Sequence, residues 1–169
     1  DLITEKIFRM IEKGVYSYYR GNCSDAFWGG PEVQNLEKEF EIFLGEDSKC
    51  LAVNSCTSAL IVACAAIGIE PGDEVIVSPW SMVCSATAPM HFGGIPVFAD
   101  IDRINWCLSP ESFEKPITNN TKAVIVVDLY GNMPEMDEIV KIAKEHNIPI
   151  LEDAAEAIGA EYKNKKAGT

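Results

Sequence analysis

The feature that most constrains the fold is a series of five short apolar runs separated by stretches with helical spacing. The runs are residues 50–53, 74–77, 95–99, 123–127 and 148–151. Each run is continuously apolar rather than alternating, as expected of strands that are covered on both faces. Helical patterns fill the gaps, at residues 57–67, 81–92, 109–115 and 136–146. This alternation predicts an α/β fold with three layers, α/β/α, around a mostly parallel sheet with right-handed crossovers.

The segments that flank this core also carry local signals. Residues 2–18 are expected to form a helix, because apolar side chains recur along one stripe of it. A loop with glycines and aromatic residues follows at 20–31. Pro31 suits the first turn of a second helix, which Gly45 would end. The tail, residues 160–166, predicts a strand that enters a hairpin.

Charge and hydropathy argue against two classes of partner. The net charge of −12 disfavours nucleic acid, whose phosphates are bound by clustered Lys and Arg. No apolar run approaches the ~20 residues of a membrane span. The longest, residues 59–69, predicts a buried helix, and no signal-peptide pattern opens the chain. We therefore expect a cytoplasmic protein that binds neither nucleic acid nor membrane.

The cysteine pattern favours free thiols in a reducing compartment. The six cysteines form no CxxC pair, so neither a zinc site nor a disulfide framework is expected, and no metal site is predicted from them. They are Cys23, Cys50, Cys56, Cys64, Cys84 and Cys107.

Chemistry-bearing residues follow the predicted strands. Ligands of open α/β sheets bind beyond the carboxyl ends of the strands. The residues expected there, in strand order, are Asn54, Ser55, Cys56 and Thr57; Trp80; Asp100 and Asp102; Asp128 and Tyr130; and Asp153 and Glu156. One hydroxyl-rich helix start, one large aromatic residue and several carboxylates should therefore share one edge.

Each of these residues has a structural and a functional interpretation. The start of the helix after residue 54 could bind a phosphate through free N–H groups and the helix dipole, or Ser55 and Thr57 could simply cap it. Trp80 could pack as core, or its face could cover a planar heterocycle. Asp153 could cap a helix or pair with a protonated ring nitrogen, since a carboxylate at this place needs a cationic partner. Asp100 and Asp102 are expected to be turn and cap residues.

From about Pro31 to its last residue the sequence resembles the sugar aminotransferases of the DegT/DnrJ/EryC1/StrS group. Several motifs match in order and spacing. They are residues 31–40 with 44–45, 53–60, 68–77, 96–102, 121–125 with 129–131, and 152–160. The resemblance implies fold type I of the pyridoxal 5'-phosphate (PLP) enzymes, with residues 31–169 forming an incomplete PLP-binding large domain. Residues 1–30 would form an N-terminal helix and a substrate or dimer loop.

The resemblance also implies a cofactor site. Its residues would be Ser55, Cys56, Thr57, Trp80, Asp153 and Glu156. The backbone N–H groups of Cys56 and Thr57, with the Thr57 hydroxyl, would hold the phosphate, and Trp80 would stack on the ring. Asp153 would pair with the pyridinium nitrogen, and Glu156 would lie near the ring hydroxyl.

The sequence departs from the family at three points. Cys56 replaces the usual glycine of the phosphate turn, and Glu156 stands where histidine or glutamine is commoner. The lysine that forms the Schiff base would lie beyond the sixteen residues that follow Asp153. Either the chain is truncated or a second polypeptide supplies the rest, so a homodimer or a complementing C-terminal chain is expected.

Four functions remain as hypotheses. The first is PLP-dependent transfer of an amino group from an amino acid, with glutamate expected, to a keto-sugar nucleotide. The second is a PLP-dependent nucleotide-sugar dehydratase, and the third is a non-catalytic PLP-fold regulatory or partner protein. The fourth ignores the resemblance and assigns a magnesium-dependent phosphotransfer site to Asp100, Asp128 and Asp153.

Overall fold

The computed structural model describes residues 1–169 except 17–18, 20, 22–24 and 46–47. The chain divides into two compact units, Asp1–Ala52 and Val53–Thr169, and each is described by itself. Cys23 and the end of the predicted helix 2–18 lie outside the described residues. The five described cysteines are all free, as the sequence predicted.

The first unit contains two helices and a short 3-10 turn. These are α1 (Leu2–Lys13), η1 (Asp25–Trp28) and α2 (Pro31–Leu44). The first helix ends earlier than predicted, because Gly14 adopts a left-handed conformation (φ 63°) and its N–H bonds back to the last turn. The second helix begins at Pro31 and stops before Gly45, as expected.

The predicted strand at residues 50–53 is wrong. No strand forms there, and carboxylates of α2 satisfy two of its backbone N–H groups instead. Glu41 accepts from the Cys50 N–H at 3.2 Å, and Glu37 accepts from the Ala52 N–H at 2.8 Å. A strand needs a neighbouring strand to pair with, and the described chain supplies none for this segment.

The second unit is built on a four-stranded parallel sheet. Its strands are β1 (Glu74–Val77), β2 (Ile95–Phe98), β3 (Thr121–Val127) and β4 (Ile150–Asp153). They lie in the order β2-β1-β3-β4, and every neighbouring pair is parallel. Because the strands are parallel, their carboxyl ends meet at one edge, and the register Val127↔Asp153 brings the ends of β3 and β4 together there.

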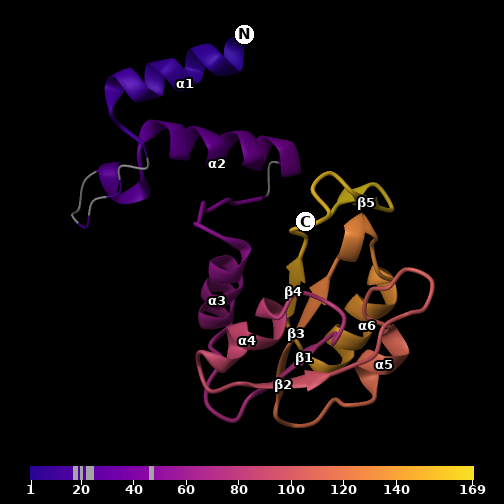
Figure 1. Ribbon diagram of the computed structural model, residues 1–169. Helices are drawn as coiled ribbons and strands as arrows, with labels where there is room; N and C mark the ends of the chain where they lie inside the picture. Colours follow the sequence, from indigo (N-terminus) through magenta and orange to yellow (C-terminus); the bar gives the residue numbers. More distant parts are fainter. Residues whose placement is uncertain (17–18, 20, 22–24, 46–47) are drawn as a thin grey trace. The chain divides into compact units, whose positions relative to one another are not determined.

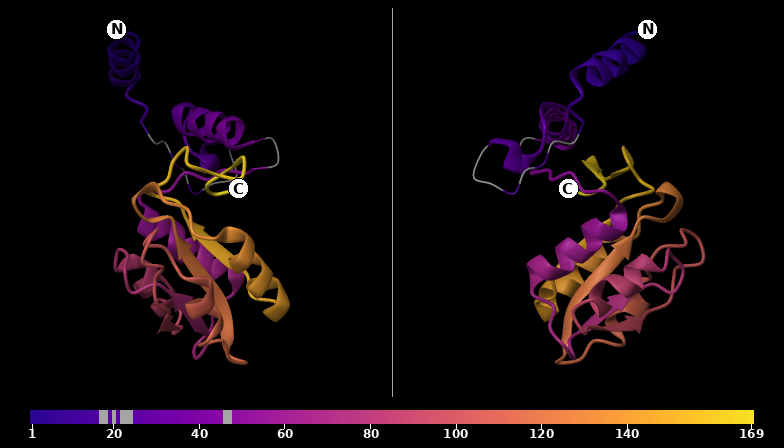
Figure 2. Two further views of the ribbon diagram at one scale, coloured as in Figure 1. Left: turned by 90° about the vertical axis from the view of Figure 1, so that its right-hand side faces the viewer. Right: turned by 60° about the vertical axis from the view of Figure 1, so that its left-hand side comes forward.

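Helices cover both faces of this sheet, which confirms the three-layer α/β/α prediction (Figures 1 and 2). On one face α3 (Cys56–Ile67) and α4 (Cys84–Met90) pack against alternate strand residues, with Leu60, Cys64 and Ala88 buried against Val75 and Ile125. On the other face lie α5 (Pro110–Glu114) and α6 (Met136–His146), with a core of ten buried residues that includes Phe113. Each large apolar side chain buried in this way stabilises the fold by about 1.5–3 kcal/mol.

The chain after β4 forms the predicted hairpin. Strands β5 (Glu161–Tyr162) and β6 (Lys165–Lys166) are antiparallel, and both turn residues, Lys163 and Asn164, have positive φ. A short 3-10 turn, η2 (Leu129–Gly131), follows β3. Among the described residues, no helix has both the length and the apolar character that crossing a membrane requires.

Candidate functional site

The start of α3 has two backbone donors that no acceptor among the described residues meets. The Ser55 hydroxyl accepts from the Ser58 N–H at 3.1 Å, and the Ser55 carbonyl accepts from the Ala59 N–H at 3.0 Å. No acceptor among the described residues meets the N–H groups of Cys56 and Thr57, and the first turn contains no acidic residue. Ser55 is thus a helix cap, and the remaining donors are available to an anion.

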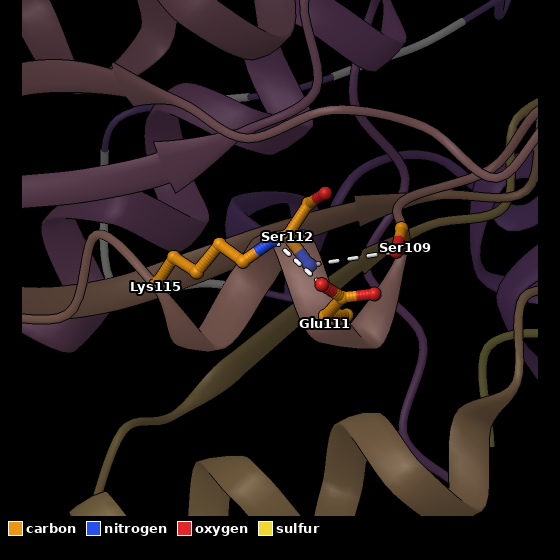
Figure 3. A network of polar contacts seen from close by, with 4 residues as sticks. All are labelled: Ser109, Glu111, Ser112 and Lys115. Atoms are coloured by element: carbon orange, nitrogen blue, oxygen red, sulfur yellow. Dashed lines mark hydrogen bonds and ion pairs between the residues drawn. The ribbon is translucent and has the colours of Figure 1, made fainter.

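The cap makes a measurable contribution to stability. Ser55→Ala is expected to lower the free energy of unfolding by about 1 kcal/mol, because the Ser58 N–H loses its partner. Ser109→Ala is the matched control, since Ser109 caps the five-residue helix α5 through a longer bond of 3.4 Å to the Ser112 N–H (Figure 3). Urea denaturation of both variants tests this, and an unchanged unfolding midpoint for Ser55→Ala would contradict it.

Asp153 ends β4 and faces the start of α3. The residue is 7% exposed, and its Oδ1 atom accepts two hydrogen bonds. The Cys56 thiol donates one at 3.3 Å, and the Ala155 N–H donates the other at 3.2 Å. The contact between the Cys56 thiol and Asp153 therefore places the carboxylate at the end of β4 next to the start of α3, where the free N–H groups lie.

The Cys56 thiol is held in its protonated form. Burial, the hydrogen bond to Asp153 and the negative charge of Asp153 together raise its pKa to about 12. The residue as a whole is exposed, but its sulfur lies against Asp153. Burial of the sulfur is therefore the largest cause of the raised pKa. At neutral pH the thiol is a hydrogen-bond donor and a poor nucleophile.

Asp128, directly after β3, is fully buried without an obvious partner. Neither of its carboxyl oxygens makes a hydrogen bond of ordinary geometry with the described residues. Burial raises its pKa to about 8, and the nearby Glu152 carboxyl, as hydrogen-bond partner and as charge, adds to the rise with Asp153. Burial and the two neighbouring carboxylates therefore favour the protonated form of Asp128.

Glu156 lies near the same edge and contacts the backbone. Its Oε2 atom accepts from the Tyr130 N–H at 2.7 Å. Tyr130 has a left-handed conformation (φ 57°), and its side chain is exposed. A carboxylate that accepts this bond anchors η2 to the chain after β4.

Trp80 follows β1 and is half exposed. It is therefore not a buried core residue, which was one of its two interpretations from the sequence. Its ring packs on Trp106 with centroids 5.8 Å apart and planes 42° apart. Sequence reasoning missed Trp106, which has a positive φ of 65° in a turn organised by Asp102. A bulky residue in this conformation is uncommon, and only the folded turn reveals it.

The acidic residues do not gather into a metal centre. Over the part of the chain that the structure describes, no three His, Cys, Asp or Glu side chains could hold a metal ion together. Asp100 accepts from the Ile101 N–H at 2.8 Å, and Asp102 accepts from the Ile104 N–H at 2.8 Å, so both are turn residues as expected. The described residues therefore offer no set of ligands for the magnesium site of the fourth hypothesis.

The sequence matches a family model and many curated proteins. A model of the DegT/DnrJ/EryC1/StrS aminotransferase family matches residues 20–169. The chain is 45% identical over 140 residues to the spore coat polysaccharide biosynthesis protein SpsC of Bacillus subtilis, covering 83% of this chain and 36% of that protein. It is 40% identical over 150 residues to the GDP-perosamine synthase of Caulobacter vibrioides, covering 87% and 40% respectively. The chain thus spans about two fifths of the length of these relatives.

Solved structures agree with the fold. An aminotransferase from Psychrobacter cryohalolentis superposes with a TM-score of 0.89 at 32% identity, covering 99% of this chain and 40% of that one. NtdA from Bacillus subtilis, solved with bound cofactor PMP, gives 0.84 at 30% identity, covering 98% and 35%. A GDP-4-keto-6-deoxymannose-3-dehydratase with a trapped PLP-glutamate geminal diamine gives 0.77 at 32% identity, covering 83% and 38%.

Proposed function

Since the chain belongs to the DegT/DnrJ/EryC1/StrS aminotransferase family, we propose that it is the N-terminal, cofactor-binding part of a nucleotide-sugar aminotransferase. The whole protein would transfer an amino group from an amino acid, with glutamate as the donor, to a keto-sugar nucleotide. When bound, PLP supplies the electron sink for bond breaking at the amino acid.

The residues present fit the cofactor. The free N–H groups of Cys56 and Thr57 would bind its phosphate, where the positive end of the α3 dipole also favours an anion. The exposed face of Trp80 would cover the ring, and the Asp153 carboxylate would hold a proton on the ring nitrogen. Glu156, held by the Tyr130 N–H, would stand near the ring hydroxyl.

One observation carries this proposal. The Cys56–Asp153 contact joins the anion-binding helix start to the carboxylate at the end of β4. A ligand that binds both would carry an anionic group at one end and a cationic group at the other, and PLP and its amine form, pyridoxamine phosphate (PMP), have both. Neither the helix cap nor the buried carboxylate alone would select such a ligand.

The phosphate half of the proposal is tested with a pair of ligands. The full chain is titrated calorimetrically with PMP and with pyridoxamine, which lacks the phosphate. PMP is expected to bind at least about tenfold more tightly, because charge-assisted hydrogen bonds at the start of α3 contribute about 1.5–3 kcal/mol. Equal affinities, or no binding of PMP, would contradict the proposal.

A sugar dehydratase is the second candidate, because one solved structure of that activity resembles this chain at 32% identity. The two candidates differ in the product that a keto-sugar nucleotide yields with glutamate and PMP. An amino sugar supports the transferase, whereas a deoxy sugar supports the dehydratase. The assay uses the full-length protein, since this chain spans under half the length of its relatives.

A further inference from the structure

We propose that Cys56 is a positioning residue, whose thiol fixes the orientation of the Asp153 carboxylate for the cationic nitrogen of the cofactor. This inference rests on the proposed function. It adds a role to a residue that stands where the family resemblance expects a glycine, which has no side chain to donate.

The two carboxyl oxygens of Asp153 differ in their hydrogen bonds. Oδ1 accepts from the Cys56 thiol on α3 at 3.3 Å and from the Ala155 N–H, on the chain after β4, at 3.2 Å. Among the described residues no hydrogen bond reaches Oδ2. Two donors from different segments hold one oxygen against the protein, so the other is left to meet a ligand.

A thiol is suited to this place because it donates without adding charge. Its pKa of about 12 keeps it protonated, so it remains a donor throughout the neutral range. A lysine or arginine in its position would neutralise Asp153 and compete with the cationic ring. An alanine would leave Oδ1 with the Ala155 N–H alone, so one of the two contacts that orient the carboxylate would be lost.

The first test measures the contact without any cofactor. Alkylation of each thiol by iodoacetamide is followed by mass spectrometry as a function of pH, in the wild-type chain and in Asp153→Asn. We expect Cys56 to react only at high pH in the wild type, and its profile to move toward lower pH once the Asp153 charge is removed. Cys50 is the internal control, because its pKa is raised by burial, Glu41 and Glu37, not by Asp153.

The second test measures the positioning. PMP affinity is determined for Cys56→Ala, Cys56→Ser and the control Cys84→Ala. We expect Cys56→Ala to bind about tenfold more weakly. Cys56→Ser should retain wild-type affinity, because a hydroxyl restores the donor. Cys84→Ala should bind normally, since Cys84 lies close to Cys56 but is not among the described donors to Asp153.

The outcomes separate this inference from the proposed function. An unchanged Cys56 profile in Asp153→Asn, or full PMP affinity in Cys56→Ala, overturns the positioning role while the cofactor site stands. If the wild-type chain folds and its thiol profile responds to Asp153→Asn, but it binds no PMP, the proposed function fails. The positioning role then falls with it. A weakened Cys56→Ala that Cys56→Ser restores supports both.

Discussion

Replacing Asp153 with asparagine is expected to weaken PMP binding by about ten- to hundredfold. A hydrogen bond to a charged group contributes about 1.5–3 kcal/mol, and each 1.4 kcal/mol is a factor of ten. Asparagine keeps the shape of the side chain and an oxygen for the Cys56 thiol, so the fold should be preserved. The variant removes only the negative charge that would hold a proton on the ring nitrogen.

Asp100→Asn is the matched control for this experiment. Asp100 also follows a strand of the sheet, but it is exposed and its carboxylate accepts from the Ile101 N–H. Calorimetric titration of both variants with PMP should show normal affinity for Asp100→Asn alone. If Asp153→Asn binds PMP as tightly as the wild type, Asp153 is not the partner of the ring.

Replacing Asp128 with asparagine is expected to stabilise the protein at pH 8 and to flatten the dependence of its stability on pH. The Asp128 pKa rises from its ordinary value of 3.8 to about 8, chiefly because the carboxyl is buried and also because of Glu152 and Asp153. The groups that face it are these two carboxylates and the Cys107 thiol. Asparagine imitates the neutral acid and cannot ionise.

The sign of the effect follows from proton counting. Between pH 4 and pH 8 the folded chain holds a proton on Asp128 that the unfolded chain has lost, so stability falls as the pH rises. The stability that this proton contributes is fully present below the pKa of Asp128 in the unfolded chain, and it is lost as the pH rises through about 8. At about 1.4 kcal/mol for each unit of pKa shift, it amounts to on the order of 5 kcal/mol.

Thermal unfolding between pH 5 and pH 8 measures this difference. The melting temperature of the wild type should fall more steeply with pH than that of Asp128→Asn, and the two curves should diverge toward pH 8. Asp100→Asn should follow the wild type. Parallel curves for Asp128→Asn and the wild type would mean that Asp128 is ionised in the folded state.

The sheet and its helices were predictable because their signals are local. Strand β1 and helix α6 have the predicted bounds, and the fold class follows from the alternation of apolar runs and helical patterns. The strand expected at 50–53 failed, because an apolar run acquires strand structure only from a partner. Helix α4 is shorter than predicted at both ends, since residues 81–83 precede it in non-helical structure and residues 91–93 form a turn.

The edge of the site was also predictable, whereas its internal contacts were not. Strand ends place Asp153 and the start of α3 on one edge of the sheet. The thiol contact, however, depends on how far α3 lies from β4. The pKa of Asp128 depends on the register that pairs Val126 with Glu152. Trp106 was missed because its conformation comes from a folded turn rather than from any sequence pattern.

A crystal structure of the chain with PMP bound would show whether the start of α3, Trp80 and Asp153 hold one ligand together. We expect the phosphate at the N–H groups of Cys56 and Thr57, the ring against Trp80, and the ring nitrogen at hydrogen-bond distance from Oδ2 of Asp153. A structure in which PMP binds with its nitrogen away from Asp153, or with its phosphate away from α3, would contradict it.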